Sequence, residues 1–282
     1  GFTEEQRRRL LPKVARGEYL GAYALSEPDA GSDVANLSCR AHRDGDEWVV
    51  HGTKMWCTYA DQADYLVLFA RTDPDKDPAK PHRGISAFLV EKERGSFPEG
   101  VTGTKVRKIG YHGWHTWELS FDGLRLPADA LLGEEGKGFY LAVSGLEVGR
   151  VHTAARAIGL ARAALEDSIT YVHQREQFGR PIGDFQAIRF KIAHMAAEIE
   201  AARQLMYHAA TEIDSGRRCS MEAAMAKYVA SEMAERVTSE AVQIHGGAGY
   251  TTDFAVERHW RDARLTRIFE GTSEIQLRVI SD

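Results

Sequence analysis

The sequence predicts an α+β protein of several domains, in which a β-barrel or sandwich over residues 21–134 precedes an antiparallel four-helix bundle over residues 135–282. In the first part, turn sequences such as EPDAGSD, RDGDE and FDG separate short runs rich in β-branched and aromatic residues. In the second part, long alanine-rich segments are almost free of proline. A chain of 282 residues also exceeds the usual size of a single domain.

Residues 1–20 are expected to form the tail of a preceding helical domain. In the stretch GFTEEQRRRLLPKV, Thr3 offers a helix cap, and acidic residues precede basic ones, which is the order that the helix dipole favours. The stretch contains no hydrophobic core of a secretory signal. Because it reads as a helix joined in mid-course, we expect the chain to begin inside a larger protein.

Four runs between residues 47 and 126 are predicted to be strands. They read EWVVHGTKMW, DYLVLFAR, GISAFLVEK and WELSFDGLRL. In the last run Trp117, Leu119 and Phe121 alternate with polar residues, which is typical of a strand with one buried face. Several short strands with turn signals between them favour a barrel or a sandwich.

Apolar residues in the second half recur with helical spacing. From Phe185 to Ile213 the steps between them alternate between three and four residues, which indicates a helix packed nearly antiparallel to others in a bundle. Similar helices are expected over residues 137–173 and 219–245, and the segment SGRRC, residues 215–219, is expected to be a turn. We interpret the Met and aromatic residues on these seams as core.

The composition excludes several classes of partner. The net charge of −5 gives no reason to expect nucleic acid, and no apolar run approaches the roughly 20 residues that cross a bilayer, so we expect no membrane insertion. Cys39, Cys57 and Cys219 lack the spacing of a metal site and fit buried residues in a reducing compartment. No metal site is predicted.

The stretch RIFEGTSEIQ places Glu270 directly before a predicted helix. Ser273 followed by Gln276 fits a capping box, which predicts a helix that begins near Ser273 and leaves Glu270 and Gly271 in the approach to it. Side chains there can project into a cleft. Most glutamates in loops are simply solvated, so the neighbouring motifs decide between the two interpretations.

Four signatures occur in order along the chain. They are YALSEPDAGSD (residues 23–33), KMWCTYA (54–60), QREQFGRPIGDFQ (174–186) with QIHGGAGY (243–250), and EGTSEIQ (270–276). Together they resemble the acyl-CoA dehydrogenases, flavoproteins that form a trans-2,3 double bond in acyl thioesters. The resemblance covers that family's middle β-domain and C-terminal helical domain, with only the last helix of its N-terminal domain.

The resemblance implies that the first two signatures contact FAD. A polar turn or a lone Trp is more often only structural, but in the family these segments border the flavin, and the residue matching Ser32 also touches the acyl-CoA. Trp56 and Thr58 match the residues that flank the isoalloxazine ring, while Cys57 and Tyr59 depart from the commoner pattern. The FAD contacts implied in this part of the chain are Tyr23, Leu25, Ser26, Gly31, Ser32, Trp56 and Thr58.

The third signature is implied to bind the other end of FAD across a subunit interface. GGAG follows a predicted helix and lacks the G-x-G-x-x-G spacing, so FAD would be held without a Rossmann fold. The implied contacts with the pyrophosphate and adenosine are Arg175, Gln177, Phe178 and Gln186, with Gln243, Gly246 and Gly247 from the partner chain. A homo-oligomer is therefore expected, as a dimer or a dimer of dimers (a homotetramer).

The fourth signature is implied to hold the catalytic base, Glu270, with Thr272 and Glu274 contacting FAD. An α-hydrogen of a thioester is weakly acidic, so its removal requires a carboxylate held beside it and donors that stabilise the enolate oxygen. Some members of the family place the base on another helix, at the position of Gly149, which leaves Glu147 as an alternative base. The implied substrate contacts are Ser32, Glu147, Arg150 and Gly271.

The function that follows from the resemblance is that of an FAD-dependent acyl-CoA dehydrogenase of fatty or branched acyl-CoA metabolism. It would form trans-2-enoyl-CoA and pass electrons to an electron-transferring flavoprotein. An acyl-CoA oxidase that uses oxygen is one alternative, and a non-catalytic, flavin-free partner subunit is another. The expected location is the cytoplasm in a bacterium, or the mitochondrial matrix in a eukaryote.

Overall fold

The computed structural model describes residues 1–75 and 77–282 and divides into two compact units. The sheet unit comprises residues 1–108 and 112–144, and the helical unit comprises residues 109–111 and 145–282. Each unit is described by itself below. The sequence placed residues 135–144 with the helices, whereas they belong to the sheet unit.

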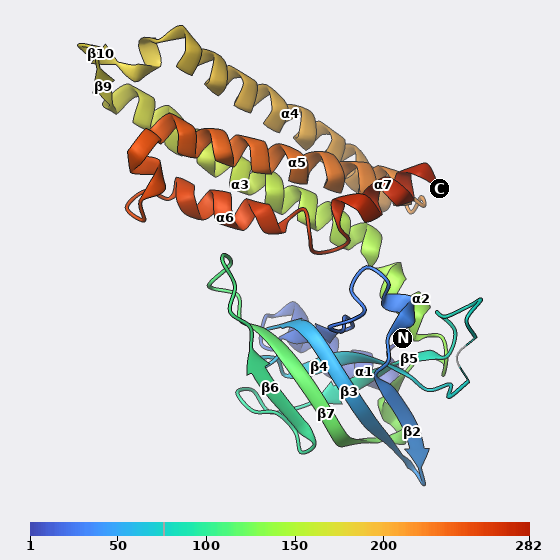
Figure 1. Cartoon of the computed structure of the whole chain (residues 1–282). Helices are drawn as coiled ribbons and strands as arrows, with labels where there is room; N and C mark the ends of the chain where they lie inside the picture. The colour runs from blue at the N-terminus through green and yellow to red at the C-terminus, as the bar shows by residue number, and fades with distance from the viewer. Residues whose placement is uncertain (76) are drawn as a thin grey trace. The chain divides into compact units, whose positions relative to one another are not determined.

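An eight-stranded mixed sheet forms the sheet unit (Figure 1). Its strands follow the order β6-β7-β3-β2-β4-β5-β8, and β1 pairs with β4 outside this path. Strands β1 and β2 run parallel to β4, and the other pairs are antiparallel. The strands are β1 (Gly21–Ala24), β2 (Arg40–Asp44), β3 (Glu47–Thr58), β4 (Tyr65–Arg71), β5 (Ile85–Glu91), β6 (Val101–Lys105), β7 (Thr116–Pro127) and β8 (Leu131–Leu132).

The main core of this unit lies between the two halves of the sheet, so the predicted sandwich is confirmed, while the sheet does not close into a barrel. Leu119 and Phe121 of β7 point into this core, as the alternation predicts, and Trp117 packs at its edge. Leu68 and Phe88 enter from β4 and β5. The four predicted strand runs correspond to β3, β4, β5 and β7.

Strand β5 is buried on both faces. Phe88 and Val90 face the main core, whereas Ile85, Ala87 and Leu89 face a second cluster that includes Leu10 of α1 (Glu4–Ala15) and Ala142 of α2 (Gly138–Ser144). Helix α1 begins with the capping box formed by Thr3 and Gln6. A Cβ on Gly138 would lie 2.5 Å from the Ser86 carbonyl carbon, so glycine lets α2 approach β5 and ties residues 138–144 to the sheet unit.

The helical unit is built on three long helices. They are α3 (Leu146–Gln174), α4 (Gln186–Asp214) and α5 (Ser220–His245), followed by α6 (Val256–Leu265) and α7 (Ser273–Ser281), while a short hairpin of β9 (Glu176–Gln177) and β10 (Arg180–Pro181) joins α3 to α4. The predicted turn at residues 215–219 separates α4 from α5. The single helix expected over residues 137–173 is instead divided at Gly145 between the two units.

Alanine dominates the core of the helical unit. Ala157 and Ala161 of α3 and Ala230 and Ala234 of α5 are fully buried, and small side chains let helices pack closely. Met195 and Ile199 on the predicted α4 seam are buried too. No helix in the described residues is long and apolar enough to span a membrane.

Replacing Phe88 by alanine tests the core between the sheet halves. The ring is fully buried and packs edge-on against Trp48, with centroids 5.2 Å apart. Phe88→Ala should lower the free energy of unfolding by about 3–5 kcal/mol because it leaves a cavity. Urea unfolding followed by tryptophan fluorescence measures this, with the exposed Leu20→Ala as control. An equal, small effect of both substitutions would contradict the proposed packing.

Candidate functional site

The turn that carries the first signature is organised around a buried carboxylate. Glu27 pairs with Ala30 through two backbone hydrogen bonds of 3.1 and 3.2 Å. Its side chain accepts hydrogen bonds from the backbone and hydroxyl of Ser38, both at 2.7 Å, and from the backbone of Cys39 at 2.9 Å. The turn is therefore a fixed structure and not a mobile loop.

Lys54 joins this turn to the second signature. It is fully buried on β3, and its Nζ donates to the Glu27 carboxylate at 2.8 Å and to the Leu25 carbonyl at 2.9 Å. The backbone of Met55 donates to the Ser26 carbonyl at 2.8 Å. The two signatures, which are some 30 residues apart in the sequence, thus lie side by side.

A β-bulge presents Trp56. The pairing between β3 and β7 shifts by one residue between Lys54 and Cys57, and Trp56 has a φ of 65° and an exposed fraction of 54%. Left-handed backbone is rare for a bulky residue and occurs mainly where function requires it. Cys57 is buried and Thr58 is partly buried, so the bulge turns the indole alone outward.

The other predicted contacts of the sheet unit differ in exposure. Tyr23 is exposed on β1 and packs against Phe69, with ring centroids 4.9 Å apart. Leu25 and Ser26 are partly buried, whereas Gly31 and Ser32 are exposed at the turn. Polar backbone and hydroxyl groups therefore lie beside the aromatic surface of the bulge.

In the helical unit, Glu270 lies in a left-handed conformation. Its φ is 55°, and its side chain is exposed directly before α7. Built on Gly149 of α3, a Cβ would lie 3.2 Å from the Glu270 Oε2, so the carboxylate rests against this glycine. The two alternative locations of the base that the sequence suggested are thus neighbours, and glycine at 149 leaves room for Glu270.

The start of α7 differs from the predicted capping box. Thr272, not Ser273, is the N-cap, and its hydroxyl accepts from the Ile275 backbone at 3.3 Å. Gln276 reaches back as expected, but it donates to the carbonyls of Gly271 at 2.8 Å and Glu270 at 3.3 Å. The prediction was one residue late because Thr and Ser are adjacent, and both can cap a helix.

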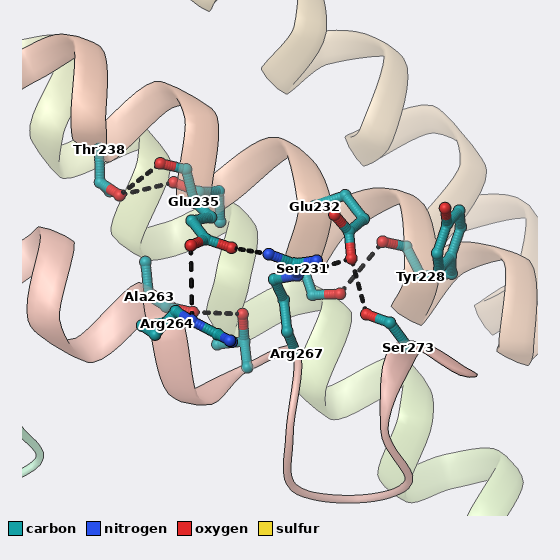
Figure 2. Close-up of polar contacts among 11 residues, drawn as sticks. Tyr228, Ser231, Glu232, Glu235, Thr238, Ala263, Arg264, Arg267 and Ser273 are labelled. Atoms are coloured by element: carbon teal, nitrogen blue, oxygen red, sulfur yellow. Dashed lines mark hydrogen bonds and ion pairs between the residues drawn. The ribbon is translucent and has the colours of Figure 1, made fainter. Parts of the chain in front are cut away.

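A polar network holds the loop that precedes Glu270 (Figure 2). Arg267 donates to Glu232 of α5 at 2.7 Å and also bonds Glu235, one turn further along α5. The Ser273 hydroxyl donates to the same Glu232 carboxylate at 2.7 Å. The hydrogen bond with Glu235 is the main cause that raises the pKa of Arg267. Both ends of the loop are thus attached to α5.

Glu147 and Arg150 lie on α3 near Glu270. Glu147 accepts hydrogen bonds from the Ser220 hydroxyl and, at 3.7 Å, from the Cys219 thiol at the start of α5. Arg150 is 8% exposed, and its buried Nε has no hydrogen-bond partner among the described residues. Burial lowers the pKa of Arg150, against the attraction of Glu147. An orphaned buried donor of this kind is suited to a ligand.

The remaining predicted contacts lie at the other end of α3. Phe178 and Gly179 form the hairpin turn with φ of 54° and 76°, and the Phe178 ring is 93% exposed. Arg175 and Gln177 are exposed in the same hairpin, and Gln186 is exposed at the start of α4. The Phe178 ring is therefore open to contact with another molecule.

A glycine turn ends α5 at the same end of the helical unit. Gly246 has a φ of 60°, and neither Gly246 nor Gly247 has any atom within 4 Å of a built Cβ, so both expose backbone in open space. His245 stacks on Tyr171 of α3, with centroids 4.1 Å apart, which joins the ends of α3 and α5. Gln243 is exposed one turn earlier.

Sequence reasoning missed Glu27, Lys54 and Lys227. Lys227 of α5 is fully buried, and its Nζ donates to the Gly271 carbonyl at 2.6 Å. A lysine inside an apolar strand or helix run is the signal that could have identified the two lysines, because lysine is almost never fully buried without a partner.

Comparisons with known proteins agree with this architecture. The sequence model of the acyl-CoA dehydrogenase middle domain matches residues 22–124, and that of the acyl-CoA dehydrogenase C-terminal domain matches residues 136–282. An acyl-CoA dehydrogenase of Bacillus subtilis (strain 168) is 47% identical over 279 residues, which are 99% of this chain and 72% of that protein.

Solved structures show the same likeness. Butyryl-CoA dehydrogenase from Megasphaera elsdenii has a TM-score of 0.93 at 44% identity, covering 99% of this chain and 71% of that one. A chain in a structure described as the electron transferring flavoprotein of Acidaminococcus fermentans has a TM-score of 0.93 at 43% identity, covering 99% of this chain and 72% of that one.

A sheet sandwich followed by a helical bundle, with these matches, defines an oxidoreductase of acyl-CoA metabolism. The chain belongs to the acyl-CoA dehydrogenase family, through its middle and C-terminal domains.

Replacing Glu27 tests the buried pair in the sheet unit. Burial alone would raise the Glu27 pKa, but the charge of Lys54 and the hydrogen bonds from Lys54 and Ser38 outweigh it and lower the pKa. Glu27→Gln leaves the Lys54 ammonium unpaired and should cost about 3–5 kcal/mol in the free energy of unfolding. The surface substitution Glu91→Gln, which removes the pair with Arg9, should cost about 1 kcal/mol or less.

The same experiment has a pH dependence of known sign. A carboxyl with a lowered pKa in the folded state stabilises the fold above its unfolded pKa, and this contribution is lost as the pH falls through the folded value. The difference in unfolding free energy between wild type and Glu27→Gln should therefore narrow in acid. Urea unfolding at about pH 7 and at a series of lower pH values down to about pH 3 measures it. A constant difference would refute the charged pair.

Proposed function

We propose that this protein oxidises acyl-CoA thioesters to trans-2-enoyl-CoA with FAD, and that Glu270 is the base that removes the α-proton. The observation that carries the proposal is the position of Glu270: a strained left-handed residue whose carboxylate lies against Gly149. Strained backbone that the surroundings hold in place is characteristic of catalytic residues. Glu147, the alternative base, has its carboxylate bound to Ser220 and Cys219.

The chemistry requires two groups from the Glu270 segment. A carboxylate oxygen takes the α-proton, and the negative charge that develops on the thioester oxygen requires a hydrogen-bond donor. The backbone N–H of Glu270 makes no hydrogen bond within the described residues, so it is available for that oxygen. One residue can thus supply both the base and a donor.

The residues present suit FAD at both of its ends. Trp56 offers an exposed indole for an isoalloxazine ring, and the neighbouring Thr58 offers a hydroxyl. Arg175 and the exposed Phe178 ring suit a pyrophosphate and an adenine, and Gly246 leaves backbone open to approach. Bound FAD would supply the acceptor for the hydride that leaves the β-carbon.

The spacing along α3 supports a homo-oligomer. Gly149, beside Glu270, and Arg175, at the far end, are separated by 26 residues, or about 39 Å of helix. This span exceeds the length of an FAD molecule, so the two groups of residues in one chain would serve different FAD molecules. We therefore propose that a second copy completes each FAD site, in a dimer or a dimer of dimers.

We propose an electron-transferring flavoprotein as the electron acceptor. A chain in the structure described as the electron transferring flavoprotein of Acidaminococcus fermentans resembles this chain, which supports the choice. An oxidase would instead pass electrons to oxygen. A non-catalytic subunit would have lost the base or the FAD contacts, whereas Glu270, Arg175, Trp56 and Thr58 are all present.

Replacing the base tests the proposal. Glu270→Gln should retain bound FAD and the binding of butyryl-CoA but lower kcat by about 10²–10⁴-fold, because a positioned base contributes that much. Turnover is measured with butyryl-CoA and an artificial electron acceptor, and FAD by its visible absorption. Glu240→Gln, on the exposed side of α5, is the control and should be neutral. Undiminished turnover by Glu270→Gln would place the base elsewhere.

Admission of air separates a dehydrogenase from an oxidase. The protein is first reduced by butyryl-CoA without oxygen, which bleaches the FAD absorption, and air is then admitted. A dehydrogenase should remain reduced for minutes and release little peroxide, since its physiological acceptor is a protein. Reoxidation within the time of one turnover, with one peroxide formed for each FAD, would favour the oxidase.

A further inference from the structure

The most unusual buried charge of the helical unit lies beneath the Glu270 loop. Lys227 is fully buried in α5, yet no carboxylate lies within ion-pair distance of it among the described residues. Its Nζ donates to a backbone carbonyl, that of Gly271, at 2.6 Å. Burying an ammonium is unfavourable, so a lysine here requires a reason other than packing.

Charged groups on α3, α5, α7 and the Glu270 loop act on Lys227. Glu232 of α5 attracts it most strongly, followed by Glu270 and by Glu274 of α7, while Arg150 of α3 repels it. Burial outweighs this attraction and lowers the pKa of Lys227 to about 8. The ammonium therefore loses its proton in a pH range where ordinary lysines stay charged.

The Gly271 carbonyl is held from two helices. Lys227 donates to it from α5, and Gln276 donates to it from α7 at 2.8 Å. A left-handed glutamate is an unfavourable conformation that persists only where the surroundings fix the adjacent peptides. The Gly271 carbonyl belongs to the peptide between Gly271 and Thr272, and Gln276 also donates to the Glu270 carbonyl at 3.3 Å. These bonds fix both peptides that follow Glu270, and through them the direction of its side chain and N–H.

We propose that Lys227 is a positioning residue, which holds the Gly271 carbonyl and thereby aims the Glu270 carboxylate and backbone N–H at the thioester. This rests on the proposed function in taking Glu270 as the base. In this role Lys227 acts through the Gly271 carbonyl and not on the reacting atoms. Its role is to keep the segment of residues 270–272 in a single conformation.

A structural lysine and a positioning lysine share the same effect of alkali on stability, but only the positioning lysine also changes activity. A lysine whose pKa is lower in the folded state than in the unfolded state destabilises the fold while it is charged, so this cost disappears as the pH rises from about 8 towards 10.5. The hold on Gly271, by contrast, weakens, because a neutral amine is the poorer donor. Activity should therefore fall in the window where the stability contribution of Lys227 rises.

The test compares three variants of the full chain loaded with FAD. Lys227→Met removes the charge and the donor at similar length, and Lys227→Arg retains a cation that does not titrate. Lys191→Met makes the same chemical change on the surface of α4, where Lys191 pairs with Glu240. Hydrogen exchange of a peptide covering residues 267–276 reports the loop without any substrate, and kcat and KM for butyryl-CoA are measured from about pH 7 to about pH 9.

Lys227→Met should keep FAD and its fold, lose protection in that peptide, and lower kcat by roughly 10- to 100-fold with little change in KM, as expected for a lost hydrogen bond to a charged group. Its kcat should also lack the alkaline decline of the wild type near pH 8. Lys227→Arg should recover part of kcat, also without the decline. Lys191→Met should match the wild type throughout.

Wild-type protection and kcat in Lys227→Met would overturn the proposal. A lower melting temperature with an unchanged loop and an unchanged pH profile would also overturn it and leave a structural role. If the wild type itself fails to oxidise any acyl-CoA, the proposed function is wrong, but hydrogen exchange still decides whether Lys227 holds the loop.

Discussion

The left-handed backbone of Glu270 is the constraint on which the helical site depends. A non-glycine residue in this conformation raises the free energy of the folded state by about 1–3 kcal/mol. Hydrogen bonds before and after Glu270 hold it there. Arg267 joins the loop to Glu232 and Glu235 before it, and the Thr272 cap and Gln276 hold it after. The long α5 helix supplies both carboxylates, so residues 32 and 35 positions away in the chain hold the loop before Glu270.

The two units fix their signature loops in the same way. Lys54 in the sheet unit and Lys227 in the helical unit are both fully buried, and each donates to a carbonyl of a signature loop, at Leu25 and Gly271. A flexible side chain with a charged end can reach a backbone group that secondary structure leaves unpaired. They differ in their counterion, since Lys54 has Glu27 in contact whereas Lys227 has carboxylates only at longer range.

The regular parts of the structure were predictable because they follow periodic patterns. Burial follows directly from two patterns: the alternation at Trp117, Leu119 and Phe121, and the apolar residues spaced three or four apart along α4. The break at Gly145 was not predictable, because the residues on both sides of it favour a helix. Only the packing of α2 against β5 separates α2 from α3. The bulge at Trp56 and the partners of the buried lysines depend on contacts distant in sequence, which no local pattern records.

Gly149 couples the stability of α3 to the position of the Glu270 carboxylate. Within a helix, glycine is less favourable than alanine by about 1 kcal/mol, and the backbone of Gly149 has no feature that forbids alanine. A methyl group there would meet the Glu270 carboxylate at 3.2 Å. An alanine at position 149 would thus favour the helix while it moves the Glu270 carboxylate by a few tenths of an ångström, so the geometry of the acid and the stability of α3 are coupled at this one position.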